Sequence, residues 1–150
     1  MGIAHLVWEC PDTQAHWRCL VEQWTGVANS GVGAVATNEI KNIFGFKMDD
    51  VPRWLVEWGR EQTLEPWETL HTVAEEMWAI GCAVTVTAIW RMNVDRVHPD
   101  GQKPLRSQER LQKYNAMVKE AFERCKWGTY PLTRESKPKL QVAEQIIRRW

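Results

Sequence analysis

A chain of 150 residues has the size of one ordinary domain, and a composition of 44% hydrophobic and 25% charged residues excludes wholesale disorder. Nineteen basic and nineteen acidic side chains give a formal net charge of zero, which excludes a general electrostatic attraction to nucleic acid. The charge is unevenly distributed, however. Residues 1–102 carry seven Lys and Arg against fourteen Asp and Glu, and residues 103–150 carry twelve against five.

The two regions therefore have formal charges of −7 and +7. We expect them to attract each other or to present solvated faces. Ten tryptophans are the most unusual feature of the composition. Each can bury roughly 150–250 Å², so we expect most of them to be core anchors on amphipathic helices, with stacking on nucleic-acid bases as the alternative.

Cysteine usage and hydropathy bear on the compartment. Cys10, Cys19, Cys82 and Cys125 are widely spaced, and no secretory signal pattern precedes them, so we expect an intracellular location, cytoplasmic or nuclear. The longest mostly apolar run, Met77 to Trp90, is shorter than the ~20 residues that a membrane span requires. No membrane segment is predicted.

The first predicted helix runs from Asp12 to Gly26. Asp12 is a suitable N-cap, Gly26 suits the end, and apolar residues between them recur at helical spacing. They are Trp17, Leu20, Val21 and Trp24. Residues 27–37 have no helical period and contain glycines, which predicts a loop, and Asn38 then caps a short helix toward Phe44.

A second helix is predicted over residues 53–60, because Pro52 suits the first turn of a helix. Its apolar face consists of Trp54, Leu55 and Trp58. Gly59 and Pro66 limit its length, so we expect a break near residues 64–66.

The strongest periodic signal begins after Pro66 and predicts a central helix of roughly twenty-five residues. Its buried stripe comprises Trp67, Leu70, Val73, Ala74, Met77, Trp78, Gly81, Cys82, Thr85, Ile89 and Asn93. The β-branched residues 84–87 weaken this prediction by roughly a few tenths of a kcal/mol each, which a half-buried helix tolerates. A strand over that stretch is the alternative.

The run His98-Pro99-Asp100-Gly101 predicts a turn where the charge balance changes sign. We place there the boundary between a body, residues 1–98, and a basic helical tail, residues 99–150. The tail is expected to hold an amphipathic helix that starts at Ser107 and ends before Gly128.

A linker over residues 130–138 should follow, and then a last helical stripe. That stripe consists of Leu140, Ala143, Ile146, Ile147 and Trp150. The whole pattern predicts an all-α fold of four to six helices, an irregular bundle with an amphipathic basic C-terminal extension.

One motif near the N-terminus carries a resemblance. It consists of the run His5-Leu6-Val7-Trp8-Glu9-Cys10-Pro11 followed by Trp17. It is similar to the second half of the zinc-binding module that lies downstream of reverse transcriptases in LINE-like non-LTR retrotransposons. That module has the pattern Cys-x2-Cys, a short spacer, His-Leu-x3-Cys-Pro and then an aromatic residue on the next helix.

A second match is the run Ala88-Ile89-Trp90-Arg91-Met92-Asn93, which resembles the Ile-Trp-x-x-Arg-Asn signature that ends the long helix after this module. Met92 stands where the family usually has Arg. The resemblance covers about residues 4 to 95. It implies a truncated, non-catalytic piece of a polyprotein whose parent would be an RNA-directed DNA polymerase, and it implies RNA or DNA as partner through that parent or through the basic tail.

The resemblance also implies zinc ligands. Three thiolates and an imidazole close the tetrahedral structural site of the family, and His5 and Cys10 are the two of these ligands present here. Two ligands cannot hold zinc as a closed site does, so the site is incomplete in this chain. His16 and Cys19 are three residues apart on one helical face, and the set His5, Cys10, His16 and Cys19 is the alternative.

No catalytic residue is predicted. Polymerase chemistry needs carboxylates that hold divalent metal ions, and the family places those in upstream domains. Asp49-Asp50 is interpreted as a solvated turn, and Glu61 and Glu75-Glu76 as polar helix faces. Cys82 and His71 are interpreted as a small buried thiol and a satisfied histidine.

Two functional hypotheses remain open. The chain is either a nucleic-acid-associated fragment of a retrotransposon polyprotein, or a free-standing helical protein-interaction domain. In the second case Trp-rich helix faces would bind a protein partner or a second copy of the chain. Neutral overall charge favours the second hypothesis, and the resemblance favours the first.

Overall fold

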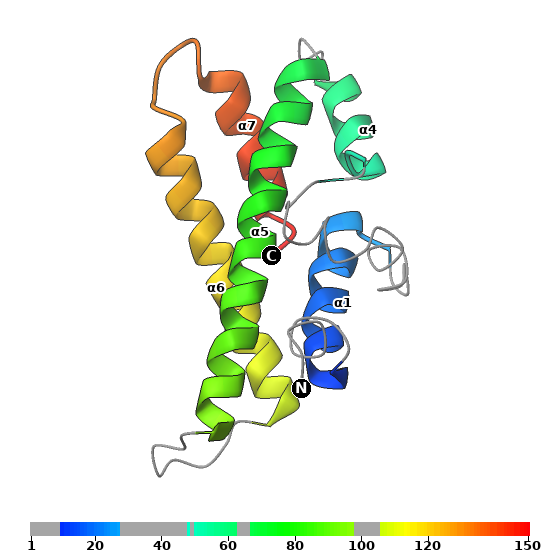
Figure 1. Ribbon diagram of the computed structural model, residues 1–150. Coiled ribbons are helices and arrows are strands. Elements are labelled where there is room, and N and C mark those ends of the chain that lie inside the picture. Colours follow the sequence, from blue (N-terminus) through cyan, green and yellow to red (C-terminus); the bar gives the residue numbers. More distant parts are fainter. Residues whose placement is uncertain (1–9, 28–47, 49, 63–66, 98–105) are drawn as a thin grey trace.

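The computed structural model describes residues 10–27, 48, 50–62, 67–97 and 106–150, which form an all-α fold (Figure 1). Its helices are α1 (Pro11–Thr25), α4 (Arg53–Glu61), α5 (Trp67–Val97), α6 (Ser107–Thr129) and α7 (Lys137–Ile147). No strand occurs among the described residues. The all-α bundle is therefore confirmed, whereas the predicted loop beyond Val27 and the short helix after Asn38 lie outside the described residues.

The long helix α5 forms the centre of the bundle and contacts α1, α4, α6 and α7. In Figure 1, α1 and α4 lie to the right of α5, and α6 and α7 pass behind it toward the left, so that α1 also contacts α6 and α4 also contacts α7. The chain runs down α5, back up along α6 and down again along α7. These last three helices are thus antiparallel neighbours, as short connections favour.

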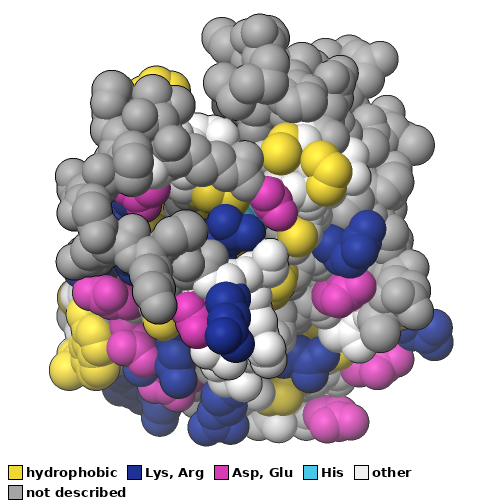
Figure 2. All heavy atoms as spheres, turned by 90° about the horizontal axis from the view of Figure 1, so that it is seen from below, with side chains coloured by type: hydrophobic (Ala, Val, Ile, Leu, Met, Phe, Trp, Pro, Cys, Tyr) yellow, Lys and Arg dark blue, Asp and Glu magenta, His cyan; other side chains and the backbone are white. Residues whose placement is uncertain are grey.

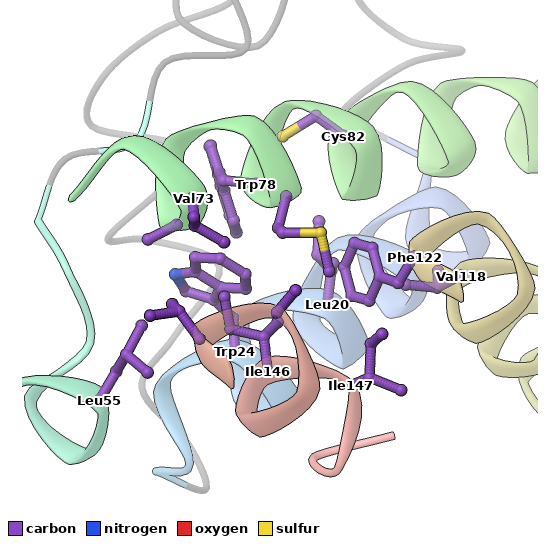
Figure 3. Packing of buried hydrophobic residues seen from close by; sticks show 14 of the residues in the cluster. Leu20, Trp24, Leu55, Val73, Trp78, Cys82, Val118, Phe122, Ile146 and Ile147 are labelled. Atoms are coloured by element: carbon purple, nitrogen blue, oxygen red, sulfur yellow. The ribbon is translucent and has the colours of Figure 1, made fainter. Parts of the chain in front are cut away.

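All five helices contribute to one hydrophobic core, shown from close by in Figure 3. The figure labels Leu20 and Trp24 from α1, Leu55 from α4, Val73, Trp78 and Cys82 from α5, Val118 and Phe122 from α6, and Ile146 and Ile147 from α7. Arg110 of α6 also lies 3.7 Å from Asp12 of α1. The boundary expected near residue 98 therefore separates regions of opposite charge that share one core.

The helix α1 forms largely as predicted. Its four apolar stripe residues are buried, and Gly26 ends the helix in the left-handed conformation with φ 72°. The predicted N-cap was wrong: Cys10 caps the helix, Pro11 occupies the first turn, and Asp12 lies one residue inside it. The cap uses the backbone carbonyl of Cys10, which accepts from the amide of Gln14 at 2.9 Å, and proline needs no partner there.

The helix α5 is 31 residues long and buries the predicted stripe, with two exceptions. Trp67 is exposed, and Asn93 is half-buried with its side chain donating to the carbonyl of Ile89. The β-branched stretch stays helical rather than forming a strand. Thr85 and Thr87 donate their hydroxyls to carbonyls four residues back, at 2.7 and 2.9 Å, which satisfies both side chains within the helix.

The two C-terminal helices differ from prediction at their ends. The helix α6 continues through Gly128 to Thr129, and the linker is shorter than expected because α7 already begins at Lys137. Pro138 therefore lies in the first turn of α7, where proline is tolerated, and not in the linker. Trp150 follows the last helical turn and is half-buried.

Tryptophans divide into three groups among the nine that the structure describes. Trp17, Trp24 and Trp78 are buried, and Trp54, Trp58 and Trp150 are half-buried. Trp67, Trp90 and Trp127 are 55%, 66% and 60% exposed. The expected role of most tryptophans as core anchors is therefore confirmed for the six buried and half-buried rings. The three exposed rings can make contacts outside the chain.

By length and composition, α5 would also be able to cross a membrane. Half of its apolar stretch is buried against the other helices, a property that core helices share. We therefore treat the hydropathy of α5 as a consequence of its central position.

A stack of side chains, which we call the C-terminal latch, holds Arg149 and Trp150 against α1 and α4. The guanidinium of Arg149 lies 4.6 Å from the ring centroid of Trp54, whose Nε1 donates to the carbonyl of Trp24 at 2.7 Å. Gly26 leaves room for this guanidinium, because a Cβ there would collide with Nη2 of Arg149. The rings of Trp24 and Trp150 pack with centroids 6.5 Å apart.

We expect the substitution Gly26→Ala to lower the free energy of unfolding by about 1–2 kcal/mol. An L side chain is strained at positive φ, and the added methyl group would displace Arg149 from Trp54. Urea unfolding followed by tryptophan fluorescence measures this change.

Gly128→Ala is the matched control, since Gly128 lies within α6 and a Cβ there would meet no atom within 4 Å. This variant should be more stable by roughly 0.5–1 kcal/mol, because alanine favours helix. A Gly26→Ala variant as stable as the wild type would contradict the left-handed end of α1.

Candidate functional site

The predicted zinc ligands can be followed only in part. Cys10 is the N-cap of α1, with extended backbone angles of φ −65° and ψ 132°, so it lies where a turn enters the helix. Its partner His5 lies outside the described residues, and the pairing of the two side chains remains a prediction. Cys10 is not part of a disulfide.

The alternative ligands His16 and Cys19 both lie on the side of α1 that faces α6. The Nδ1 atom of His16 lies 2.7 Å from the carbonyl oxygen of Asp12, and its ring meets the ring of Tyr114 edge-on, with centroids 5.0 Å apart. The thiol of Cys19 donates to Oδ1 of Asn115 at 3.2 Å. The described residues contain no group of three or more His, Cys, Asp or Glu side chains able to hold a metal ion.

Burial also sets the protonation of both side chains in the packed chain. Burial is the main cause that lowers the pKa of His16, and nearby Arg110 lowers it further, so the imidazole is neutral near pH 7. Burial is likewise the main cause that raises the pKa of the Cys19 thiol, which stays protonated and donates to Asn115. We interpret both side chains as polar contacts between α1 and α6.

A buried hydroxyl pair joins α5 and α6 beside these contacts. The hydroxyls of Thr85 and Tyr114 lie 2.5 Å apart, and both side chains are fully buried. Burial raises the pKa of Tyr114, which therefore remains a neutral phenol. The sequence predicted an amphipathic helix that includes Tyr114, but it carries no signal for the partner of this side chain, because the pairing depends on how α5 and α6 are aligned.

The side chains that the sequence analysis considered for catalysis are packed in the core or lie in ordinary surface contacts. Burial raises the pKa of Cys82 to about 12, so this thiol is inert. His71 pairs with the exposed carboxylate of Glu75, 3.5 Å away, and Glu76 accepts a hydrogen bond from the hydroxyl of Tyr130. Asp50 is exposed.

Glu61 and Asp49 are the remaining carboxylates interpreted from the sequence. Glu61 is exposed at the end of α4, as the prediction of a polar helix face requires. Asp49 lies outside the described residues, so the geometry of the predicted Asp49-Asp50 turn remains a prediction.

One open cleft of about 470 Å³ lies where α1 and the end of α7 meet. It is lined by Cys19, Glu22, Gln23, Gly26, Arg148 and Arg149. The C-terminal ends of two helices converge here, and their negative dipole ends favour nearby arginines. The two cations therefore have a structural role and do not by themselves indicate an anion site.

The α6–α7 corner is a more promising surface. Within residues 119–139 the sequence holds six cations and three carboxylates. The cations are Lys119, Arg124, Lys126, Arg134, Lys137 and Lys139. We call these residues, together with the exposed side chains of Trp127 and Leu132, the basic corner. The Nζ atom of Lys126 lies 4.5 Å from the Trp127 ring centroid.

The comparisons with known proteins leave the family open: no protein-family model, no curated protein and no solved structure matches this chain. The resemblance to the retrotransposon zinc-binding region therefore rests on the motifs in residues 4–95 alone.

The neutral state of His16 makes stability depend on pH. The pKa of His16 is lowered in the folded chain, so the unfolded chain takes up this proton first as the pH falls below about 6.5. The contribution of His16 is complete above that pH and is lost as the pH falls toward the folded pKa. We expect His16→Gln to reduce the loss of unfolding free energy between pH 8 and pH 5.5, measured by urea unfolding.

His71→Gln is the control, because His71 lies on the surface of α5. Equal pH dependence in the wild type and in His16→Gln would show that His16 is not held as neutral imidazole.

For the predicted half-site we expect weak zinc binding that requires Cys10, since two ligands hold zinc less tightly than four. Zinc measured by mass spectrometry after equilibrium dialysis should fall in Cys10→Ser and stay unchanged in Cys125→Ser. Absence of zinc from all three proteins would remove the site.

Proposed function

We propose that this chain is a non-catalytic, nucleic-acid-associated helical module that derives from the zinc-binding region of a LINE-like reverse-transcriptase polyprotein. The motifs around His5, Cys10 and Trp90 support this origin. The proposal includes an intracellular location, cytoplasmic or nuclear. It assigns no reaction to the chain, because polymerase chemistry belongs to other domains of such polyproteins.

The observation that carries the proposal is the exposed ring of Trp127 in the basic corner. A tryptophan side chain that is 60% exposed leaves apolar surface in contact with water, which is unfavourable. Stacking of a base on the ring would cover that surface. The cations around it can contact phosphates, and Lys137 lies at the first turn of α7, whose N-terminal dipole also favours anions. Aromatic and cationic groups side by side are the usual means of binding single strands.

The charge distribution limits the size of this interaction. Figure 2 shows the end of the molecule opposite the basic corner, where Lys and Arg side chains are interspersed with Asp and Glu, so this end adds no broad basic surface. Arg124 and Lys126 also have carboxylate partners, Glu120 and Glu144. A local, moderate affinity for single-stranded RNA or DNA therefore fits better than a broad electrostatic attraction to duplexes.

We expect the full chain to bind a short unstructured oligouridylate, and Trp127→Ala to weaken this binding by about 1–3 kcal/mol, or at least fivefold, through loss of one stacked base. Fluorescence anisotropy of a labelled RNA measures the affinity. About three phosphate contacts predict a slope near −2 in a plot of log K against log salt concentration.

Trp90→Ala is the matched control, because Trp90 is as exposed as Trp127 but lies on α5 away from the basic corner. It should leave the affinity and the salt slope unchanged. A negligible salt slope, or equal losses in both variants, would remove nucleic-acid binding at this corner.

Protein binding is the second candidate function. It is favoured by one observation, the exposed apolar side of α5 around Trp90. Residues 77–90 contain no charged side chain that could contact a phosphate, so this surface suits a protein better than a nucleic acid.

A further inference from the structure

The side of α5 that faces away from the other helices has two parts, and we call this side the outer face. In chain order it consists of Glu68, Thr72, Glu75, Ala79, Ala83, Thr87, Trp90 and Val94, which are exposed or half-buried. These positions lie within a narrow sector when residues are placed at 100° intervals. The first third is acidic, and the remainder, from Ala79 onward, is apolar.

When a partner covers the apolar part, the indole N–H of Trp90 is the side-chain donor there that needs an acceptor from the partner or from water. Trp90 is 66% exposed and Val94 is 38% exposed, so the described helices leave much of the Trp90 ring and part of Val94 open. Thr87 is the one hydroxyl in this part, and it already donates to the carbonyl of Ala83 at 2.9 Å. Burial of this surface would therefore remove apolar area from water at little polar cost.

The sizes of the side chains make this surface complementary to itself. It contains two small residues, Ala79 and Ala83, toward one end, and two larger residues, Trp90 and Val94, toward the other. Consider a second copy related by a two-fold axis that is perpendicular to α5 and passes beside residues 86 and 87. In this antiparallel pair Trp90 of one copy lies opposite Ala83 of the other, and Val94 lies opposite Ala79. Large side chains then fill the space above small ones in both halves, as a two-fold interface requires.

Repulsion between carboxylates also favours the antiparallel orientation over the parallel one. In a parallel pair the carboxylates of Glu68 and Glu75 would face their own counterparts, which costs free energy. In the antiparallel pair they lie at opposite ends.

We propose that the chain forms a weak homodimer in which the outer faces of two α5 helices pack antiparallel. This rests on the second candidate function and gives it a defined partner. The exposed part of each Trp90 is roughly 150 Å², and the whole contact buries on the order of 700 Å² in the two copies. Stable interfaces bury about 1,200–2,000 Å², so the dimer forms only at high concentration.

Sedimentation equilibrium of the full chain tests the proposal. The apparent mass of the wild type should rise from 17.5 kDa toward twice that value as the concentration increases from micromolar to millimolar. Trp90→Ala should weaken the association at least tenfold, since each dimer loses two buried rings. Trp127→Ala, which removes an equally exposed ring elsewhere, should associate like the wild type.

Cysteine cross-linking tests the orientation. Thr87→Cys lies beside the axis, so copper phenanthroline and air should link the thiols of two copies into a disulfide dimer. In Val94→Cys the two thiols lie about 22 Å apart along the axis in the antiparallel pair and should not be linked. The wild type, treated alike, gives the background from the native cysteines.

The outcomes separate this proposal from nucleic-acid binding. A wild type that stays at 17.5 kDa throughout, equal effects of Trp90→Ala and Trp127→Ala, or equal cross-linking at residues 87 and 94 would each overturn the antiparallel dimer. None of these results depends on RNA, and the RNA titration with Trp127→Ala stands or fails independently. Circular dichroism of each variant confirms that it remains helical.

Discussion

The fold depends on α5 being apolar around most of its circumference. A helix that packs against α1, α4, α6 and α7 must bury a broad part of its surface. That requirement explains the long uncharged stretch from Met77 to Trp90, and it explains why Thr85 bonds its hydroxyl to Gly81 and to Tyr114. The shorter helices need only one apolar face each, and they owe their positions to α5.

Periodicity predicted the helices of the fold well because their apolar residues recur at helical spacing without interruption. Trp17 to Trp24 marked α1, and Gly26 marked its end through the left-handed conformation that glycine adopts easily. The errors fall at helix ends, where neighbours decide. Trp67 shares the helical period but lies in the first turn of α5 and is 55% exposed, and α6 includes Gly128 and ends at Thr129.

Functional surfaces were less accessible to sequence reasoning than the core. The sequence distinguishes a tryptophan from other residues but does not tell which ring lacks a neighbouring helix, so Trp90 and Trp127 could not be separated from Trp24 and Trp78. The orientation of α1 likewise determines the surroundings of the alternative metal ligands. His16 and Cys19 share a face, as their spacing predicted, but that face is the one packed on α6.

The C-terminal latch also has a consequence for the order in which the chain folds. Trp24 and Trp150 are in ring contact although 126 positions separate them, and Arg149 closes over the end of α1 from the same distance in sequence. Contacts of such long range form late, because a large loop must close before they are made. On the ribosome, α1 therefore emerges with its apolar stripe uncovered and stays so at least until α5 and α6, which pack against it, have been synthesised. That interval is when this tryptophan-rich sequence is most exposed to aggregation and most dependent on chaperones.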